Sequence, residues 1–365
     1  YNIAIGYGSG GAITTGIRNT IIGGLAGDAL TDADQNVAVG HATLGNDTLG
    51  SGSTAVGYAA LNSQNFTTAT TAYNTAVGYT AGNALTTGES NTFIGGLAGD
   101  AITTASNNVA VGTNALTADT LGARSVAIGS AALANQNFTT SVNSYNVAVG
   151  TLAGNQLTTG IHNTFVGGLV AQSATVTGGS NTCVGFNAGN ALTSGGNNLF
   201  LGHDAGISGS PGGQFAASSN TIVIGDENIA QTFTQVSIQV TSDQRDKTDF
   251  NGLDLGLDFV KALEPVTYYW DKRSKYGDKY ADDYDLNAQT PDGTHKEDWM
   301  DIGFKAQAVR DLEEAAGYKQ SDKKNLTVSL TPDGKQYALK YERFVPILVK
   351  AIQDQDAIIT SLTAR

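Results

Sequence analysis

A serine and a lysine five residues apart form the pair in this sequence best suited to covalent chemistry. Ser242 begins the string Ser-Asp-Gln-Arg-Asp-Lys, which ends at Lys247. A serine hydroxyl is a weak nucleophile until a base removes its proton, and a deprotonated lysine can be that base. Without other motifs, a serine and a lysine at this spacing are usually part of a surface turn. Asp243 and Arg245 lie between the two residues and are candidates to support them.

The composition of the chain changes at the same point. Its 365 residues carry a formal net charge of -13 and include 46 glycines, 5 prolines and 1 cysteine. Before residue 242 the only basic residues are Arg18 and Arg124, and all the prolines follow residue 210. This division predicts two domains, a Gly-rich fibre over 1–241 and a different domain over 242–365.

Charge and hydropathy exclude two classes of partner. Nucleic-acid phosphates are bound by clustered lysine and arginine, which this acidic chain lacks. No apolar stretch approaches the length of a transmembrane helix, and no signal peptide opens the sequence. We therefore expect neither nucleic-acid binding nor membrane insertion.

A pentapeptide recurs throughout the first domain: Asn or Ser, a small or apolar residue, Ala or Phe, Val or Ile, and Gly. One copy is Asn36-Val37-Ala38-Val39-Gly40. The closing glycines are Gly6, Gly23, Gly40, Gly57, Gly78, Gly95, Gly112, Gly129, Gly150, Gly167, Gly185 and Gly202. Three spacings of 17 residues and one of 21 make a 72-residue super-repeat, and a period of this kind is typical of a solenoid.

Each apolar run is short, β-branched and bounded by Asn and Gly, which favours a strand that ends in a turn. Side chains alternate along a strand, so Val37 and Val39 face one way and Ala38 the other. A second, weaker strand is expected in each coil, such as Ala84-Leu85-Thr86. Two or three small buried side chains cannot offset the entropy of ordering a coil, so we expect partner chains to complete the core.

The repeat also resembles a known group of proteins. Arg124-Ser125-Val126-Ala127-Ile128-Gly129 is similar to Asn-Ser-Val-Ala-Ile-Gly, which the head repeats of trimeric adhesins of the YadA-like type carry. The resemblance implies a trimeric β-roll. The predicted fold class is therefore mainly β, a trimeric β-solenoid of 17-residue coils, and a bacterial trimeric adhesin stays open as an alternative.

Both 21-residue coils contain the same aromatic motif, with Phe66 and Tyr73 in the first and Phe138 and Tyr145 in the second. An aromatic loop repeated at a fixed axial interval is a candidate contact for a receptor. The alternative is that these loops pack on a neighbouring chain.

The sequence predicts no metal and no cofactor. Asp28, Asp32 and Asp34 could bind calcium, but the equivalent turn of the next super-repeat loses two of the three carboxylates. The four histidines are far apart and lack ligand spacing. A polysaccharide-degrading spike is a further alternative, although glycoside hydrolysis normally uses two carboxylates on a concave face and the acids here lie mainly in turns.

Four ordered motifs mark the second domain: the Ser242 to Lys247 string, Pro265-Val266-Thr267-Tyr268-Tyr269-Trp270, 302–309 and 341–348. Together they resemble the intramolecular chaperone domain of phage tailspikes and tail fibres, the endosialidase-type or S74 peptidase family. The resemblance spans the last 124 residues and implies a small α+β domain. It also implies that Ser242 follows the cut, that Lys247 is its partner, and that Thr241-Ser242 is the bond of a single-turnover autoproteolysis.

The end of the chain shows the spacing of a coiled-coil seam. Leucine, isoleucine and glutamine recur at intervals of 4, 3, 4 and 3 residues at Leu348, Ile352, Gln355, Ile359 and Leu362. With the family resemblance, this pattern predicts a trimeric coiled-coil helix.

The resemblance implies a viral function: a phage tail fibre or spike segment for host attachment. Its C-terminal domain would direct trimerisation and folding and then be released by self-cleavage. The expected partners are two further copies of the chain, a host cell-surface glycan or protein receptor, and other virion tail proteins. The expected location is the extracellular virion tail, after assembly in the host cytoplasm.

Overall fold

The computed structural model describes residues 1–172, 174–238, 240–281 and 283–364. The chain divides into two units, and each has a hydrophobic core of its own. The first unit contains Tyr1–Pro211 and Phe215–Asp226, and the second contains Gly212–Gln214 and Glu227–Arg365. No helix within the described ranges is long and apolar enough to cross a bilayer.

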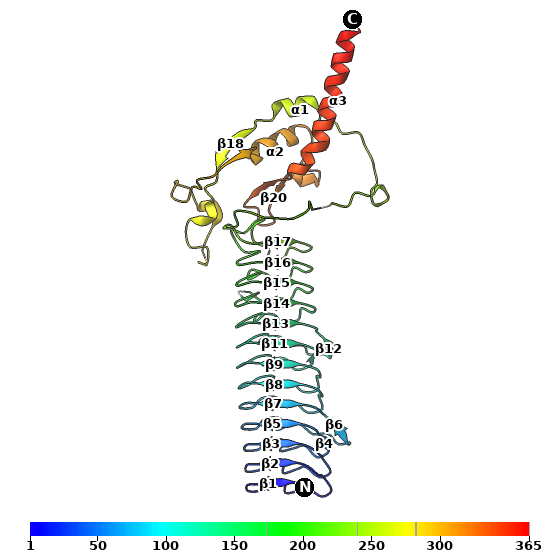
Figure 1. Ribbon diagram of the computed structural model, residues 1–365, viewed down its shortest axis with the longest axis vertical. Helices are drawn as coiled ribbons and strands as arrows, with labels where there is room; N and C mark the ends of the chain where they lie inside the picture. The colour runs from blue at the N-terminus through cyan, green and yellow to red at the C-terminus, as the bar shows by residue number, and fades with distance from the viewer. Residues whose placement is uncertain (173, 239, 282, 365) are drawn as a thin grey trace. The chain divides into compact units, whose positions relative to one another are not determined.

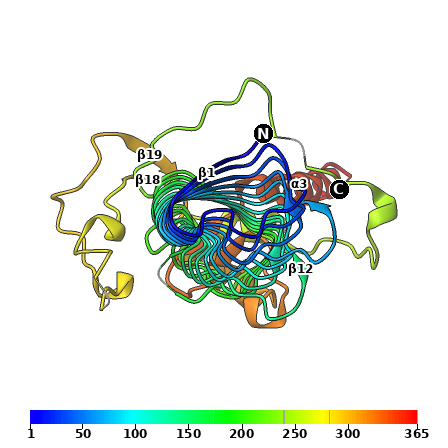
Figure 2. The same ribbon diagram turned by 90° about the horizontal axis from the view of Figure 1, so that it is seen from below.

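A parallel sheet of 13 short strands runs along the first unit, one strand in each coil (Figure 1). Seen along the solenoid axis in Figure 2, successive coils superpose. The strands are β1 (Ile3–Ile5), β2 (Thr20–Ile22), β3 (Val37–Val39), β5 (Thr54–Val56), β7 (Thr75–Val77), β8 (Thr92–Ile94), β9 (Val109–Val111), β11 (Val126–Ile128), β13 (Val147–Val149), β14 (Thr164–Val166), β15 (Thr182–Val184), β16 (Leu199–Leu201) and β17 (Ile222–Ile224). The predicted β-solenoid is confirmed.

Register follows the repeat, because each strand pairs with the same three positions of the next coil. Ala38 of β3 lies opposite Ala55 of β5, for example. The structure adds one coil to those that the sequence predicts: β17 is followed by Gly225, which comes 23 residues after Gly202.

From β2 to β17, the middle residue of each three-residue strand points into the solenoid, as buried Ala38 does, while its neighbours on the strand are at least partly exposed. Loop leucines and alanines such as Leu85 join these residues in one continuous cluster from Ile21 to Val223. The expectation that partner chains complete the core is therefore wrong. The expectation counted only the side chains of the pentapeptide. The loop side chains are also buried, and one chain buries them by itself.

The expected second strand at 84–86 is also wrong, because this segment turns to bury Leu85. Within the described residues, additional parallel strand pairs of two residues each occur only where the 21-residue coils lie. They are β4 (Gly50–Ser51) with β6 (Thr70–Thr71), and β10 (Gly122–Ala123) with β12 (Val142–Asn143).

Buried asparagines join one coil to the next. Each donates its side-chain N–H to a loop carbonyl of the following coil at 2.7–3.0 Å. Its side-chain oxygen accepts a backbone N–H of that coil at 2.8–3.1 Å. This asparagine ladder consists of Asn19, Asn36, Asn74, Asn91, Asn108, Asn146, Asn163, Asn181 and Asn198. It satisfies backbone groups that would otherwise be buried without a partner.

The second unit combines short helices and strands around a small core. Its elements are α1 (Leu257–Ala262), β18 (Val266–Tyr269), β19 (Met300–Gly303), α2 (Ala306–Ala315), β20 (Val328–Leu330), β21 (Tyr337–Leu339) and α3 (Phe344–Thr363), with 3-10 turns η1 (Gln244–Asp246), η2 (Arg273–Lys275), η3 (Leu286–Ala288), η4 (Gln320–Asp322) and η5 (Tyr341–Arg343). Strand β18 pairs antiparallel with β19, and β20 with β21. Phe259 of α1 packs with Phe344 and Ile347 of α3.

The crowding at the closing glycines predicts a large difference in stability between two glycine-to-alanine variants. At Gly112, where φ is +132°, an added Cβ would lie 2.5 Å from the carbonyl oxygen of Gly129. We expect Gly112→Ala to lower the free energy of unfolding by about 1–3 kcal/mol or more. Gly96→Ala is the control, because an added Cβ there meets no atom within 4 Å. Equal thermal denaturation midpoints for the two variants would contradict this account.

Candidate functional site

A single 3-10 turn brings Ser242 and Lys247 together. The carboxylate of Asp243 caps η1 by accepting the backbone N–H of Arg245 at 2.9 Å. The chain then reverses, so that the Lys247 ammonium donates to the Ser242 hydroxyl oxygen and lies 3.3 Å from the Ser242 carbonyl oxygen. The spacing of five residues therefore gives direct contact between the two predicted catalytic side chains.

Arg245 is occupied in holding this turn. Its Nη2 lies 2.6 Å from Asp243 Oδ2, and its Nε also donates to the same carboxylate. The Arg245 guanidinium holds the pKa of the Asp243 carboxyl below its usual range. Asp243 and Arg245 thus form a clasp around the turn, which positions Lys247 beside Ser242.

The whole segment is exposed to solvent, including Thr241 on the other side of the predicted scissile bond. A lysine becomes an effective base where its ammonium is desolvated or lies near other cations. One chain therefore supplies the contact between the serine and the lysine, while the described part of that chain leaves both in water.

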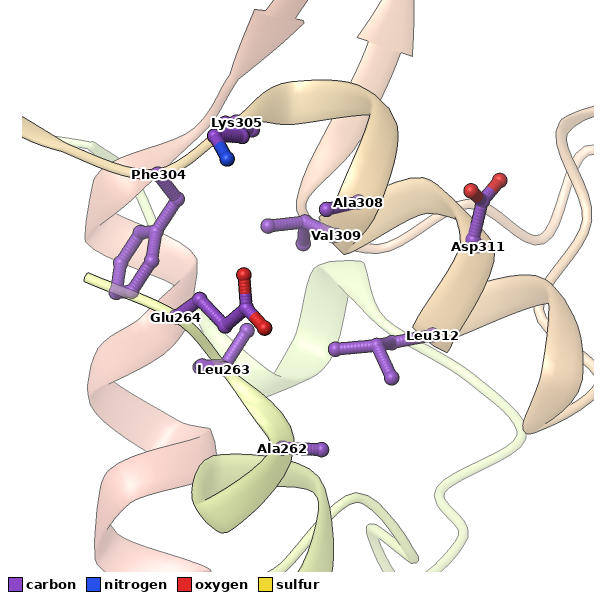
Figure 3. Close-up of a pocket in the computed structure, with 9 residues that line it drawn as sticks. All are labelled: Ala262, Leu263, Glu264, Phe304, Lys305, Ala308, Val309, Asp311 and Leu312. Carbon is purple, nitrogen blue, oxygen red and sulfur yellow. The ribbon is translucent and has the colours of Figure 1, made fainter. Parts of the chain in front are cut away.

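The second unit also contains a cavity of about 290 Å³ between the end of α1 and the start of α2 (Figure 3). Figure 3 shows Phe304, Leu263 and Val309 on its apolar walls, with charged side chains beside them. Neither Ser242 nor Lys247 lines this cavity. The serine–lysine pair therefore lies in an exposed turn and is separate from this cavity.

The four predicted receptor contacts fall into two groups. Phe66 and Phe138 are only 5% and 6% exposed, so their rings anchor the 21-residue coils from inside. Tyr73 and Tyr145 are 67% and 46% exposed. Each tyrosine has a left-handed backbone conformation directly before a ladder asparagine. Only the two tyrosines offer substantial surface to a partner.

A buried polar network shapes the same two coils. The ladder has a serine at Ser125 in place of asparagine, and the Gln136 amide donates to this hydroxyl at 2.9 Å and to Asp119 at 2.6 Å. Gln136 in turn accepts from the ladder residue Asn146 at 2.9 Å. Asp119 also accepts backbone N–H groups, including that of Phe138 at 3.1 Å, and burial raises its pKa.

Equivalent residues repeat this network 72 positions earlier, at Asp47, Ser53, Gln64 and Asn74. The sequence alone did not predict this network. The signal was the coincidence of a serine in the asparagine position with a long coil, and both super-repeats carry it.

The predicted seam lies along α3 and is exposed, with Ile352 at 65%. The other exposed seam residues are Leu348, Gln355, Ile359 and Leu362. Phe344, Ile347 and Ala351 form a buried face beside it, in the first half of the helix. The helix therefore has one apolar face buried within its own unit and a second apolar face open to solvent.

Comparison with known proteins identifies one family. Residues 242–318 match the model of the peptidase S74 family, described as chaperone of endosialidase. The match begins at Ser242 and includes Lys247, which confirms the predicted resemblance over this segment. No curated protein and no solved structure matches the chain.

Proposed function

We propose that this chain is a segment of a phage tail fibre or tailspike whose C-terminal domain directs trimer formation and is then released by self-cleavage. The observation that carries the proposal is the chaperone-family match, which begins at a serine in direct contact with a lysine. The domain follows a repeat-built solenoid, the kind of extended product whose assembly benefits from a chaperone.

Exposed apolar surface supports assembly with identical chains. The α3 seam is open along its length, and the 4, 3, 4, 3 spacing suits a coiled coil. Residues 227–241 add Val236 and Ile238, which are 76% and 83% exposed and alternate as in a β-strand. Two further copies of the chain would cover both surfaces.

The chaperone solves a problem of register. Every coil presents nearly the same partly exposed strand side chains, so two solenoids can associate one coil out of step at little cost in free energy. A domain that trimerises first sets the three chains in phase. Its removal then leaves the fibre without the piece needed to reverse assembly, which stabilises the product kinetically.

The cleavage proceeds as an acyl transfer followed by hydrolysis. Neutral Lys247 takes the proton from Ser242 Oγ, which attacks the carbonyl carbon of Thr241. The peptide C–N bond breaks, the lysine returns the proton to the Ser242 nitrogen, and an ester joins Thr241 to Oγ. Water then opens the ester, giving a carboxylate on Thr241 and a free amine and hydroxyl on Ser242. Trimer assembly supplies the desolvation that makes Lys247 a base.

The released fibre serves host attachment, in a virion tail together with other tail proteins. Tyr73 and Tyr145 are exposed, repeat 72 positions apart and belong to the aromatic sequence that only the two 21-residue coils share. A host glycan or protein that contacts both would bind along the fibre rather than at one end. Assembly takes place in the host cytoplasm before incorporation into the virion.

Replacing the nucleophile tests self-cleavage. We expect Ser242→Ala and Lys247→Arg to leave full-length chains, because arginine keeps the charge but does not release a proton. Intact-mass analysis of the purified wild type should instead give two fragments that join at Thr241-Ser242. Ser237→Ala, in the same exposed segment, is the control and should be cleaved. A wild-type chain that stays whole would contradict the self-cleavage proposal but not the assembly proposal.

A charge in the α3 seam tests trimer formation. Ile359→Asp would place three carboxylates in an apolar seam at a cost of several kcal/mol. We expect this variant to elute as a monomer in size-exclusion chromatography with light scattering. Thr360→Asp adds the same charge one residue away from the seam and should stay trimeric. Trimers for both variants would show that α3 does not hold the assembly together.

Tyrosine removal tests attachment. We expect Tyr73→Ala with Tyr145→Ala to reduce binding of labelled trimers to host cells at least tenfold, measured by flow cytometry on a strain that the wild type labels. Tyr58→Ala is the control, because Tyr58 is 51% exposed but has no aromatic counterpart 72 positions later, where the chain has Ser130. Undiminished binding by the double variant would assign attachment to another surface.

A further inference from the structure

We propose that His203, Asp204 and Asp226 bind a divalent transition-metal ion such as Zn²⁺ and fasten the last coil of the solenoid to the coil before it. All three belong to the first unit, and their ligand atoms lie within 4.8 Å of one another. One imidazole nitrogen and two carboxylate oxygens are a donor set that suits such ions.

The distances among the donors fit a shared ion. His203 Nδ1 lies 3.3 Å from Asp204 Oδ2 and 3.4 Å from Asp226 Oδ2. Ligands held at about 2.1 Å in a tetrahedral arrangement lie about 3.4 Å apart, so these two distances are those of neighbouring ligands on one ion. The third donor pair falls within the same 4.8 Å, and water would complete the coordination.

Burial of the donors favours an ion over a solvated cluster. The side chains of Asp204 and Asp226 are 0% and 8% exposed, whereas that of His203 is 52% exposed. Two buried carboxylates side by side favour a divalent positive charge between them. The exposed imidazole leaves one side of the site open for the ion to enter.

The surroundings orient the donors as outer-shell groups do at metal sites. Asn187 donates from Nδ2 to Asp204 Oδ1 at 2.6 Å, which leaves Oδ2 directed at the imidazole. The His203 ring stacks on Phe186, with centroids 5.7 Å apart and an interplanar angle of 17°. Such partners fix ligand orientation and contribute to metal affinity.

The solenoid contains its own control for this site. His41 also follows a closing glycine and stacks on a ring, that of Tyr58, at 5.5 Å and 8°. At the positions that correspond to Asp204 and Asp226, however, it has Ala42 and Tyr58. The two histidines therefore share a backbone position, and each stacks on an aromatic ring, but only His203 has the carboxylates beside it.

The position of the site gives it a structural role. His203 directly follows the glycine that ends β16, and Asp226 follows the glycine that ends β17, so the ion would join two consecutive coils. The last coil is also the longest, and an exposed Ile222 and Ile224 flank its buried Val223. A metal bridge would oppose opening of this terminal strand.

Titration of the EDTA-treated, dialysed protein, as purified, with ZnCl₂ in a calorimeter tests the site. We expect one Zn²⁺ per chain to bind to the wild type and to His41→Ala. In His203→Ala and Asp226→Asn this binding should weaken more than about 100-fold, beyond the 10–100-fold loss that an outer-shell partner causes. Asp226→Asn keeps the shape of the side chain, so a folding defect would not explain its loss.

Hydrogen exchange supplies the second readout. Zn²⁺ should slow amide exchange at least tenfold in β17 of the wild type and leave exchange in β3 unchanged, while neither strand should respond in His203→Ala. Absence of saturable binding up to about 1 mM Zn²⁺ would overturn the proposal. Equal binding by all four proteins, or unaltered exchange in β17, would do the same.

Discussion

The asparagine ladder is the interaction on which the rest of the first unit depends. A solenoid of 17-residue coils has few side chains per coil, yet it buries backbone groups on the inside of every turn. Each ladder asparagine satisfies one carbonyl and one N–H of the next coil. Because both partners are in the next coil, the ladder fixes the register of the sheet. The close approach of the closing glycines and the alignment of loop leucines follow from that register.

The second unit shows what a single chain does and does not complete. The turn from Ser242 to Lys247 is fully formed, with Asp243 and Arg245 clasping it, although it lies in water. The buried face of α3 is likewise in place, while the seam around Ile352 remains open. The residues that position groups locally have partners within the chain, and those that remain uncovered are the ones proposed to meet other copies.

Local repeats in the sequence predicted a large part of the fold, because Gly and β-branched residues act within one coil. The alternation of Val37, Ala38 and Val39 is of this kind, and the structure confirms it. The spacing of Ser242 and Lys247 is also local, and the structure places the two side chains in contact. The core was underestimated because burial of Leu85 depends on how the loop closes. The sequence suggested Phe66 as a receptor contact, but its ring is buried. This burial depends on packing between coils, which the sequence of one coil does not show.

The remaining misses have the same cause. The Gln136 network and the His203 cluster join residues that are distant in sequence and adjacent only after coils stack. His203 and Asp226 are 23 residues apart, and no ligand spacing read from the sequence applies to them. In a solenoid, the coil length determines which residues of successive coils become neighbours, and the coil length varies in this chain.

The polar networks at Ser53 and Ser125 make the 72-residue super-repeat a self-contained cassette. Each cassette opens and closes on ladder positions of the same geometry and carries its own glutamine to bridge the serine. Gain or loss of a whole cassette by recombination would leave every interface between coils intact. Fibre length could therefore change in steps of four coils, or about 19 Å. The reach of the fibre could then change during evolution without any new contacts between coils.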